Sequence, residues 1–423
     1  MKHRLLSLLA AACCAAPLPV LAVDYSVAGF GTLGYARSDS PYAYQRVIDS
    51  GGTFNRDSLF GVQLDASFTP QWSATLQARV SPSDHADKGW SPTLSWAFLT
   101  WRPDNDWRIR VGKLRMPAYL HSSNMDVAAT FDFARLPAEV YWLSPTPDFT
   151  GASVIRDWSN RHGDFQLEAY WGRTDTYWRQ YFRTSYLGFK PPGVYYLPIE
   201  LEVKGLTFTY RDAEDVVKLS VMDARDRMQS GERWKVPTRV VPAPGVSYYD
   251  FIPGPGDVLY QHFRVFVVGA DLGLWQGVRL QAEYAKRKSM EVPGGINSSG
   301  GYVSLRKPMG AWTPYVYYSK AKAAERDLEF YRQLDSSNLP ASVDPSGFIN
   351  AMQRSGADAF GVLDQHTWGV GTSYSVGVNA KLKAELARTR IGLGSNLMVD
   401  VPAGREPGNW GFNVLSLSYS FVF

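Results

Sequence analysis

The sequence contains two pairs of basic residues, and the two members of each pair are two positions apart. Both pairs lie in stretches where apolar and polar residues alternate as they do in β-strands. Arg108 and Arg110 form the first pair, and Lys381 and Lys383 form the second. Successive residues on one face of a strand are about 7 Å apart, so each pair places two positive charges in a row. Guanidinium groups bind carboxylate and phosphate bidentately, which favours organic anions over chloride. The chemistry that these residues offer is therefore reversible binding of small anions.

The same alternation assigns a wider set of charged residues to one face of the strands. The basic members are Arg79, Arg108, Arg110, Lys218, Arg264, Arg279, Arg287, Lys381 and Lys383, and the acidic members are Asp65, Glu168, Glu283 and Glu385. Any one of these charged side chains, taken alone, is explained as well by solvation or by pairing with an opposite charge as by a role in anion binding. The positive excess over the whole set favours anions, because a low-dielectric wall focuses the field of fixed charges.

Patterns that would support catalysis or metal binding are weak. The histidines after residue 22 are His85, His121, His162, His262 and His366. None has the HExxH spacing, and none lies near a GxSxG elbow. The carboxylates of Asp104 and Asp106 lie in a turn sequence, where aspartate is favoured for its backbone hydrogen bonds. We expect no enzyme, metal or cofactor, although an active site assembled from distant loops stays an alternative.

A glycine string near the start of the chain matches the dinucleotide-binding fingerprint. Residues 29–34 read GFGTLG, and Asp49 or Asp57 would be the distant ribose acid. The fingerprint requires a preceding strand and a following helix. Only residues 23–28 precede the string after the predicted cleavage site, and no amphipathic helix follows. Glycines in an opening β-strand are therefore the preferred interpretation.

The first 22 residues have the pattern of a secretory signal peptide. Lys2 and Arg4 precede an apolar run, and the small residue Ala22 ends the predicted cleavage site. A lipoprotein signal at Cys13 is the alternative, but the apolar run continues past it. Cys13 and Cys14 are the only cysteines, so the mature chain, residues 23–423, is expected to hold no thiol, disulfide or cysteine metal site.

Composition narrows the class of protein further. Aromatic residues make up 14% of the chain, with 14 Trp and 24 Tyr, yet the mean hydropathy is mildly polar. Strands with one lipid-facing side and aromatic belts give that combination. No apolar stretch after the signal approaches the ~18 residues of a membrane helix. The net charge of +4 is too balanced to indicate a nucleic-acid partner.

Several segments alternate with the period of two that is typical of β-strands. Residues 60–68 and 71–80 are separated only by Thr69-Pro70, so they are predicted to be antiparallel neighbours. Residues 94–101 and 107–114 form a second pair, joined by a turn sequence. Residues 94–101 are apolar on both faces, and alternation does not orient them. Pro314 interrupts a later segment, whose strand is predicted to begin at Tyr315.

The last fourteen residues, 410–423, form the clearest alternating segment. Tyr419, Phe421 and Phe423 fall on its apolar face, and serines occupy most of the other face. An apolar, aromatic face on a terminal strand needs lipid or protein to cover it. The segment resembles the closing strand of Gram-negative outer-membrane barrels, whose final aromatic residue belongs to the signal that the barrel-assembly machinery recognises.

Short and long connectors alternate along the chain, as in outer-membrane barrels. The pattern predicts an all-β, transmembrane antiparallel β-barrel of about sixteen strands, with short periplasmic turns and long extracellular loops. Residues 116–150 form a long connector rich in aromatic residues and proline. A connector of that length is usually functional, and we expect it to fold into the barrel as a constriction loop. Its acids Asp126, Asp132 and Glu139 are predicted to face wall arginines across the narrowest point.

Three stretches together resemble the Gram-negative outer-membrane porins of the sixteen-stranded, trimeric type. They are residues 57–68 (DSLFGVQLDASF), 107–117 (WRIRVGKLRMP) and 417–423 (LSYSFVF). The resemblance implies passive diffusion of small solutes, with Arg79, Arg108, Arg110, Arg279, Lys381 and Lys383 lining the pore. It also implies outer-membrane lipid and lipopolysaccharide, the barrel-assembly machinery and a homotrimer as partners. The segment after Pro117 lacks the acidic, glycine-rich string of general diffusion porins, and a plugged, structural or adhesin barrel stays an alternative.

Overall fold

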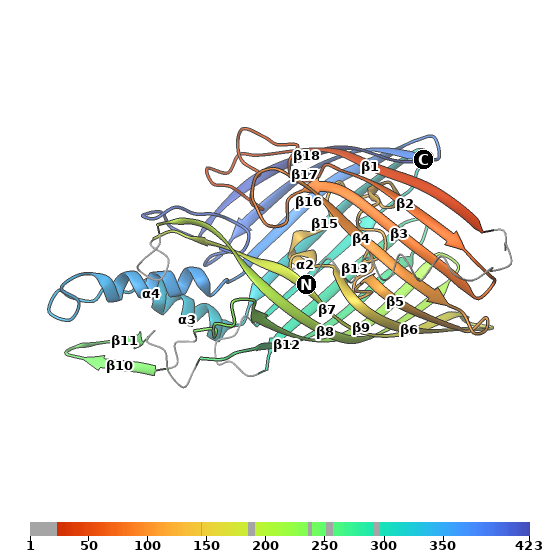
Figure 1. Ribbon diagram of the computed structural model, residues 1–423. Helices are drawn as coiled ribbons and strands as arrows, with labels where there is room; N and C mark the ends of the chain where they lie inside the picture. Colours follow the sequence, from red (N-terminus) through yellow and green to blue (C-terminus); the bar gives the residue numbers. More distant parts are fainter. Residues whose placement is uncertain (1–22, 145, 185–190, 236–238, 251–256, 291–296) are drawn as a thin grey trace.

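Sixteen antiparallel strands form one closed barrel in the computed structural model (Figure 1). The structure describes residues 23–144, 146–184, 191–235, 239–250, 257–290 and 297–423; the predicted signal peptide, residues 1–22, lies outside the described residues. The barrel strands are β1 (Asp24–Ser38), β2 (Leu59–Ser67), β3 (Trp72–Pro82), β4 (Trp90–Trp101), β5 (Trp107–Arg115), β6 (Asp148–Asn160), β7 (Gly163–Phe182), β8 (Gly193–Asp212), β9 (Asp215–Met228), β12 (Gln261–Gly273), β13 (Arg279–Ser289), β14 (Ser298–Arg306), β15 (Trp312–Ala323), β16 (Asp364–Val376), β17 (Ala380–Ile391) and β18 (Trp410–Val422). The predicted fold class and strand number are confirmed.

The barrel closes where the first strand meets the last. β1 pairs with β18 from Phe30 opposite Val422 to Ser38 opposite Val414, and its other edge pairs with β2. Every other neighbouring pair in the barrel order is antiparallel as well, so each strand has a partner on both edges. A closed sheet leaves no row of unpaired backbone groups, which is the condition for spanning a membrane with strands.

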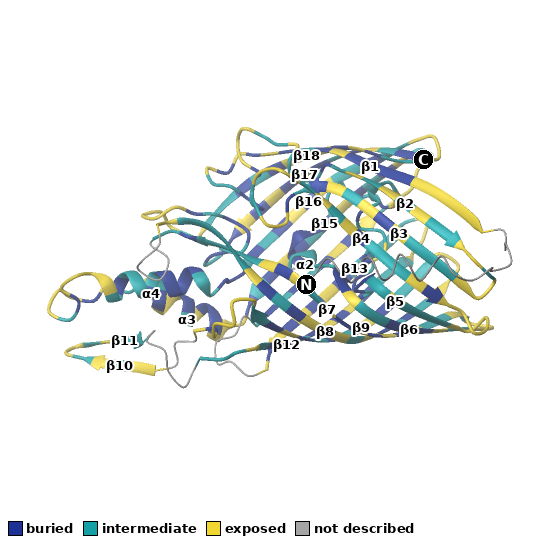
Figure 2. Ribbon diagram, viewed as in Figure 1, coloured by how far each residue is buried: buried dark blue, intermediate teal, exposed yellow. Residues whose placement is uncertain are grey.

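The two faces of the barrel wall differ in polarity, and the difference follows the alternation of the sequence. In β18, Leu415, Leu417 and Tyr419 are exposed on the outside, whereas Ser416 and Ser418 are buried on the inside. Bands of exposed and buried residues alternate along the strands in Figure 2. The apolar outer face matches a lipid environment. Among the described residues, no helix is long and apolar enough to cross a membrane.

A β-bulge together with two aromatic residues that face the lumen explains why alternation does not orient the segment at 94–101. The register of β3 and β4 shifts between Gln77 and Ala78, opposite the extra residue Ser95. Leu94 before the bulge and Leu99 after it are both exposed on the outer wall. Because of the extra residue, even-numbered side chains point outward before the bulge and inward after it. The side chains of residues 96 and 98 therefore face the lumen.

The prediction that the strand at Pro314 begins at Tyr315 is wrong. β15 begins at Trp312, and Pro314 pairs with Thr372 of β16. The carbonyl of Pro314 accepts a hydrogen bond from the N–H of Lys307, just beyond the end of β14 at Arg306. The N–H that proline lacks therefore falls on the side where the neighbouring strand ends, and little hydrogen bonding is lost.

Long connectors gather at one end of the barrel and short turns at the other (Figure 1). The long-connector end carries the helices α3 (Glu325–Asp335) and α4 (Phe348–Ala359) and a separate hairpin of β10 (Arg239–Ala243) and β11 (Val246–Asp250). Two short helices, η1 (Ala128–Thr130) and α2 (Ala138–Tyr141), belong to the connector between β5 and β6. The short–long asymmetry read from the sequence is thus present in the fold.

The C-terminal residue completes the closing pair, and its removal should impair barrel assembly. The N–H of Gly29 donates to the carbonyl of Phe423 at 2.8 Å, and the N–H of Phe423 donates to the carbonyl of Gly29 at 2.9 Å. The Phe423 ring covers Gly29, where a Cβ would lie 2.1 Å from it. We expect deletion of Phe423 to reduce the heat-modifiable, folded band on SDS gels and the outer-membrane fraction.

A matched control for this deletion is Trp275→Ala, which removes an aromatic side chain that is 67% exposed in the turn between β12 and β13. Because Trp275 takes no part in closure, this variant should assemble normally. Normal insertion of the chain that lacks Phe423 would contradict the role given to the terminal residue.

Candidate functional site

The described part of the connector between β5 and β6, residues 116–144 and 146–147, packs against inward-facing residues of the barrel wall and is called the inner segment. The last three residues of the predicted connector, 148–150, belong to β6. Phe133 of the inner segment packs edge-on against three wall tyrosines, with ring centroids 5.7 Å from Tyr302, 5.2 Å from Tyr315 and 5.8 Å from Tyr317. Buried aromatic packing of this kind fixes the segment against the wall formed by β14 and β15.

One glycine permits the close approach of α2 to the wall. The carbonyl oxygen of Glu139 would lie 1.8 Å from a Cβ at Gly300 in β14. Any side chain at this position would push α2 away from the sheet, so the absence of a Cβ at Gly300 is what allows this packing.

Asp126, the first of the three predicted loop acids, is bound directly by two arginines. It pairs with Arg79 of β3 and with Arg115 of β5, whose Nη2 lies 2.7 Å from the carboxylate. Burial of Asp126 raises the pKa of its carboxyl, but the two guanidinium charges outweigh burial and hold the pKa below its usual range. Asp126 is therefore ionised at neutral pH and ties the inner segment to this side of the barrel.

Asp132 is bound to strands on the opposite side. Its carboxylate accepts hydrogen bonds from Lys381 Nζ and from Ser373 Oγ, each at 2.7 Å, and lies 3.7 Å from Arg306. These partners belong to β17, β16 and β14. In the strand order β14 and β16 lie seven places from β5, nearly halfway round the barrel, and β17 lies four places from β3. The inner segment therefore spans the lumen from wall to wall.

Glu139 is held by neutral donors and is almost fully buried. Its carboxylate accepts hydrogen bonds from Ser319 Oγ at 2.8 Å, Gln365 Nε2 at 2.8 Å and Thr367 Oγ1 at 2.6 Å. Each of the three predicted acids thus contacts the wall directly, and no open gap separates it from its partner. Pairing offsets the desolvation of a buried carboxylate, which is costly when it stands alone.

Three of the six predicted pore-lining residues are used to hold the inner segment. Arg79 and Lys381 bind its acids, as described above. Lys383 donates to the carbonyls of Ala128 at 2.6 Å and Phe133 at 2.9 Å. Arg279 lies elsewhere, at the short-turn end, where Asp271, Glu214 and Asp215 surround its guanidinium.

The two remaining residues, Arg108 and Arg110, face a cavity of about 480 Å³ on the short-turn side of the inner segment. Arg108 is paired with Asp157 at 2.6 Å. The Arg110 guanidinium lies over the ring of Phe98, 5.3 Å from its centroid. Among the described residues, Arg110 has no hydrogen-bonding or acidic partner, so it is the less compensated of the two charges.

The cavity is predominantly basic. Its charged lining residues are Arg102, Arg108, Arg110, Arg115, Arg211 and Lys218, with Asp65 and Glu168 as the acids. Sequence reasoning missed three of these residues. Arg102 follows β4 in a turn sequence, and Arg115 lies one residue past the predicted end of its strand. Arg211 lies on the inward face of β8 with the buried Thr207 and Thr209, so extending that alternation would have found it.

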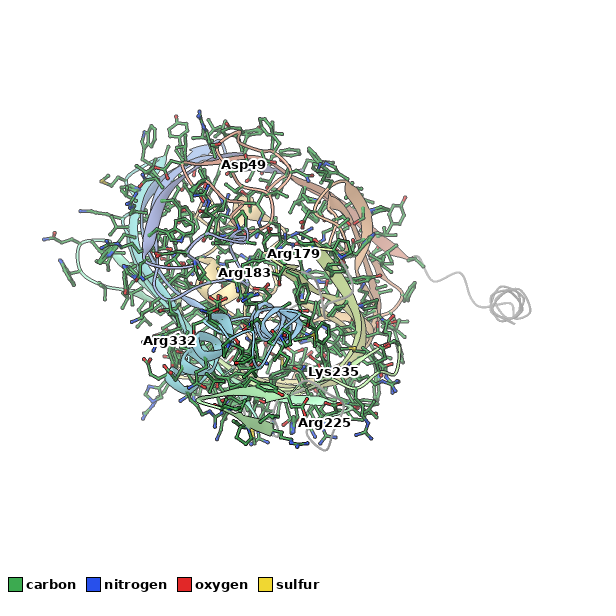
Figure 3. All side chains as sticks on the ribbon, turned by 90° about the vertical axis from the view of Figure 1, so that its left-hand side faces the viewer. Asp49, Arg179, Arg183, Arg225, Lys235 and Arg332 are labelled. Carbon is green, nitrogen blue, oxygen red and sulfur yellow. The ribbon has the colours of Figure 1, made fainter. Side chains whose placement is uncertain are left out.

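The long-connector end contains a second charged cluster that sequence reasoning missed. Arg179 of β7 binds Asp87, in the β3–β4 connector, at 2.8 Å and Asp400, in the β17–β18 connector, at 2.5 Å. Arg183, just after β7, binds Asp335 and Asp358 of the α3–α4 region. Figure 3 looks onto this end, where Arg179 and Arg183 lie toward the middle of the view. These ion pairs join connectors that start on opposite sides of the barrel.

The geometry around His85 and His121 gives no support to catalysis. Ser83 Oγ lies 3.3 Å and Asp84 Oδ1 2.8 Å from the same ring nitrogen, Nδ1 of His85. A serine–histidine–aspartate triad needs these partners on opposite nitrogens. His121 is buried in the inner segment, and burial lowers its pKa to about 4, so it is neutral at pH 7. Among the described residues, no three potential ligands are grouped around a metal site.

No protein-family model and no curated protein matches this chain, but solved structures do. OmpT of Vibrio cholerae matches with a TM-score of 0.51 at 11% identity, over 96% of this chain and 99% of that chain. The anion-selective porin of Comamonas acidovorans matches with 0.51 at 9%, over 95% and 100%. OprB of Pseudomonas putida matches with 0.52 at 10%, over 95% and 94%. The chain therefore has the sixteen-stranded barrel fold of the Gram-negative outer-membrane porins.

Proposed function

We propose that this protein is an outer-membrane channel for the passive diffusion of small hydrophilic solutes, with a preference for anions and small organic acids. The observation that carries the proposal is the basic cavity on the short-turn side of the inner segment, whose lining has six basic and two acidic residues. Arg108 and Arg115 are paired with acids outside the lining, which leaves four basic residues without an ion pair in the described part of the chain: Arg102, Arg110, Arg211 and Lys218. Fixed positive charges in a low-dielectric wall raise the local concentration of anions and lower that of cations.

The barrel dimensions agree with this role. Side chains fill the interior of an eight-stranded barrel, whereas sixteen strands enclose a lumen wide enough for water. The inner segment narrows that lumen and leaves the basic cavity on one side. A channel needs charged residues at fixed positions but no catalytic residues. The arrangement around His85 and His121 is compatible with a channel, because neither histidine has the partners of a catalytic triad. We therefore propose a transport role and no enzymatic one.

A plugged or structural barrel is the second candidate, and a specific observation favours it. The inner segment is bonded to strands nearly halfway round the barrel from each other, through Asp126 to Arg115 of β5 and through Asp132 to Ser373 of β16 and Arg306 of β14. The ion pairs of Arg179 join connectors across the long-connector end. A planar-bilayer recording with purified protein separates the candidates, because a plugged barrel conducts no current.

Charge reversal at Arg108 and Arg110 should weaken anion preference. Both side chains line the cavity, and Arg108→Glu with Arg110→Glu changes its charge by four units. We expect the anion-to-cation permeability ratio, taken from the reversal potential under a KCl gradient, to fall on the order of tenfold. Arg239→Glu is the matched control, since Arg239 is on the hairpin outside the barrel and its side chain is 77% exposed. Cation preference in the unmodified protein would refute the anion proposal.

Shortening the inner segment should raise single-channel conductance. Deletion of residues 126–139 removes the part that is bonded to both walls, and the conductance should rise on the order of twofold as the constriction widens. A gentler variant combines Asp132→Asn with Lys381→Met and releases one tie without leaving a lysine unpaired. The heat-modifiable gel shift verifies folding of both variants. Unchanged conductance in the folded deletion variant would place the inner segment outside the conducting path.

We further propose a homotrimer in outer-membrane lipid and lipopolysaccharide, inserted by the barrel-assembly machinery. OmpT of Vibrio cholerae, whose fold is similar, has been solved in a trimer form. Light scattering in mild detergent should give a protein mass three times that of one chain. Heating in SDS provides the monomer reference for the same preparation. A monomer mass before heating would rule out the trimer.

A further inference from the structure

Two aromatic side chains face the lumen beside the basic cavity. The bulge in β4 turns Trp96 and Phe98 inward, and both line the cavity with Leu114, Pro117 and Ile155. The ring centroids of Trp96 and Phe98 are 6.2 Å apart. A passage for hydrated ions alone has no use for such a surface, because aromatic rings offer apolar contact area and nothing to a hydrated ion.

An arginine guanidinium lies over each of these two rings, but only one of the two arginines forms ion pairs with acidic residues. Arg115 lies over Trp96 with its charge centre 5.8 Å from the ring, and it is paired with Asp126 and Asp148. Arg110 lies over Phe98 and forms no ion pair among the described residues, although the cavity acid Glu168 attracts it from beyond ion-pair distance. The cavity therefore combines an apolar surface with one stacked guanidinium that is available to a ligand.

We propose that this cavity binds monocyclic aromatic carboxylates, an inference that rests on the proposed channel function and names its solute class. The carboxylate pairs with the Arg110 guanidinium, whose fork matches its geometry. The ring contacts the apolar surface formed by Trp96, Phe98 and Ile155. A volume of about 480 Å³ falls within the usual range of small-molecule sites, roughly 300–1,000 Å³.

The acids of the lining favour a single negative charge on the ligand. The Asp65 carboxylate accepts hydrogen bonds from Thr75 at 2.6 Å and Gln63 at 2.7 Å, and no cation pairs with it among the described residues. Glu168 lines the same cavity without an ion pair in the described part of the chain. Two acids this near repel dianions such as phosphate or dicarboxylates more strongly than monocarboxylates. The apolar lining then discriminates among monocarboxylates by ring contact.

The test uses sodium benzoate, with acetate and cyclohexanecarboxylate as matched carboxylates and benzyl alcohol as the neutral ring. Added to one side of single channels in KCl, benzoate should interrupt the current at concentrations at least about tenfold below those of acetate, since ring contact adds to the charge interaction. Cyclohexanecarboxylate should act more weakly than benzoate, and benzyl alcohol should have no effect. Titration calorimetry of the detergent-solubilised protein should give the same order of affinities without any need for current.

Two variants separate the contributions of charge and ring. Arg110→Gln should weaken benzoate and acetate by similar factors. Phe98→Leu should weaken benzoate at least about fivefold more than acetate, because loss of the ring under Arg110 affects both anions but only benzoate also loses a ring contact. Trp101→Leu is the control, since Trp101 lies on the outer face of the same strand. Its benzoate affinity should equal that of the unmodified protein.

The outcomes distinguish failure of this inference from failure of the channel proposal. Equal affinities for benzoate and acetate would overturn the inference even if the KCl reversal potential shows anion preference. Absence of current with benzoate binding intact in calorimetry would overturn the channel and retain the site. If Phe98→Leu gives no folded band on the gel, the comparison of benzoate with cyclohexanecarboxylate on the unmodified protein decides the question: equal affinities for the two would refute a preference for aromatic rings.

Discussion

The pairing of β1 with β18 is the constraint on which the rest of the molecule depends. A backbone N–H or C=O without a partner costs several kcal/mol in hydrocarbon, so a sheet that faces lipid has to close. The closing pair runs from Phe30 opposite Val422 to Ser38 opposite Val414. Once that register is set, alternation decides the face of every residue in the regular strands. Each inward side chain then faces one shared lumen, where the charged residues have to be paired or solvated.

The inner segment buries and pairs the inward charged residues on one side of the barrel and leaves those on the other side facing open space. On the side of β13, Glu283 accepts hydrogen bonds from Tyr302 Oη at 2.9 Å, from the N–H of Leu120 at 2.8 Å and from Tyr141. Glu385 of β17 is likewise buried and accepts from a wall tyrosine, Tyr315, at 2.7 Å. These acids are covered by the inner segment and contribute little to the open space. The cavity is left to the strands from β2 to β9, where basic residues predominate.

Sequence alternation predicted the regular part of this fold. It failed where the orientation or the end of a strand depends on a local irregularity or on a residue distant in the sequence. It predicted the number of strands, the closing strand and the alternation of short and long connectors. It could not orient β4, because the extra residue Ser95 reverses the alternation in mid-strand. It also misplaced the start of β15, because the cost of Pro314 depends on where the neighbouring strand ends.

The charged groups at the long-connector end were beyond sequence reasoning for a different reason. Arg179 meets Asp87, which is 92 residues away, and Asp400, which is 221 residues away. All three residues lie in or beside irregular connectors, where no period links a residue to its partner. Such ion pairs arise only after closure has brought the connectors to one end of the barrel. The acids of the inner segment are a similar case. The sequence identified these acids as candidate residues, but it could not identify the residues that bind them.

Two residues with the same spacing in the sequence show why counting inward charges is insufficient. Lys383 and Arg110 each follow another basic residue by two positions, and both face the lumen. Lys383 is buried, holds two carbonyl groups of the inner segment and lies 4.2 Å from the centre of the Phe131 ring. Arg110 lies at the cavity and has no acidic partner among the described residues.

The Lys383 ammonium uses two of its three protons on carbonyl oxygens of the inner segment and also lies against the Phe131 ring, so little of its charge is directed at a solute. Lys383 therefore contributes to the position of the inner segment, which sets the size of the opening. Arg110 contributes to the potential inside the opening, since no carboxylate among the described residues lies within ion-pair distance of it and Glu168 attracts it only from farther away. The selectivity of this lumen consequently depends on the few charges that the fold leaves without partners, and far less on the larger number of inward charges that the sequence displays.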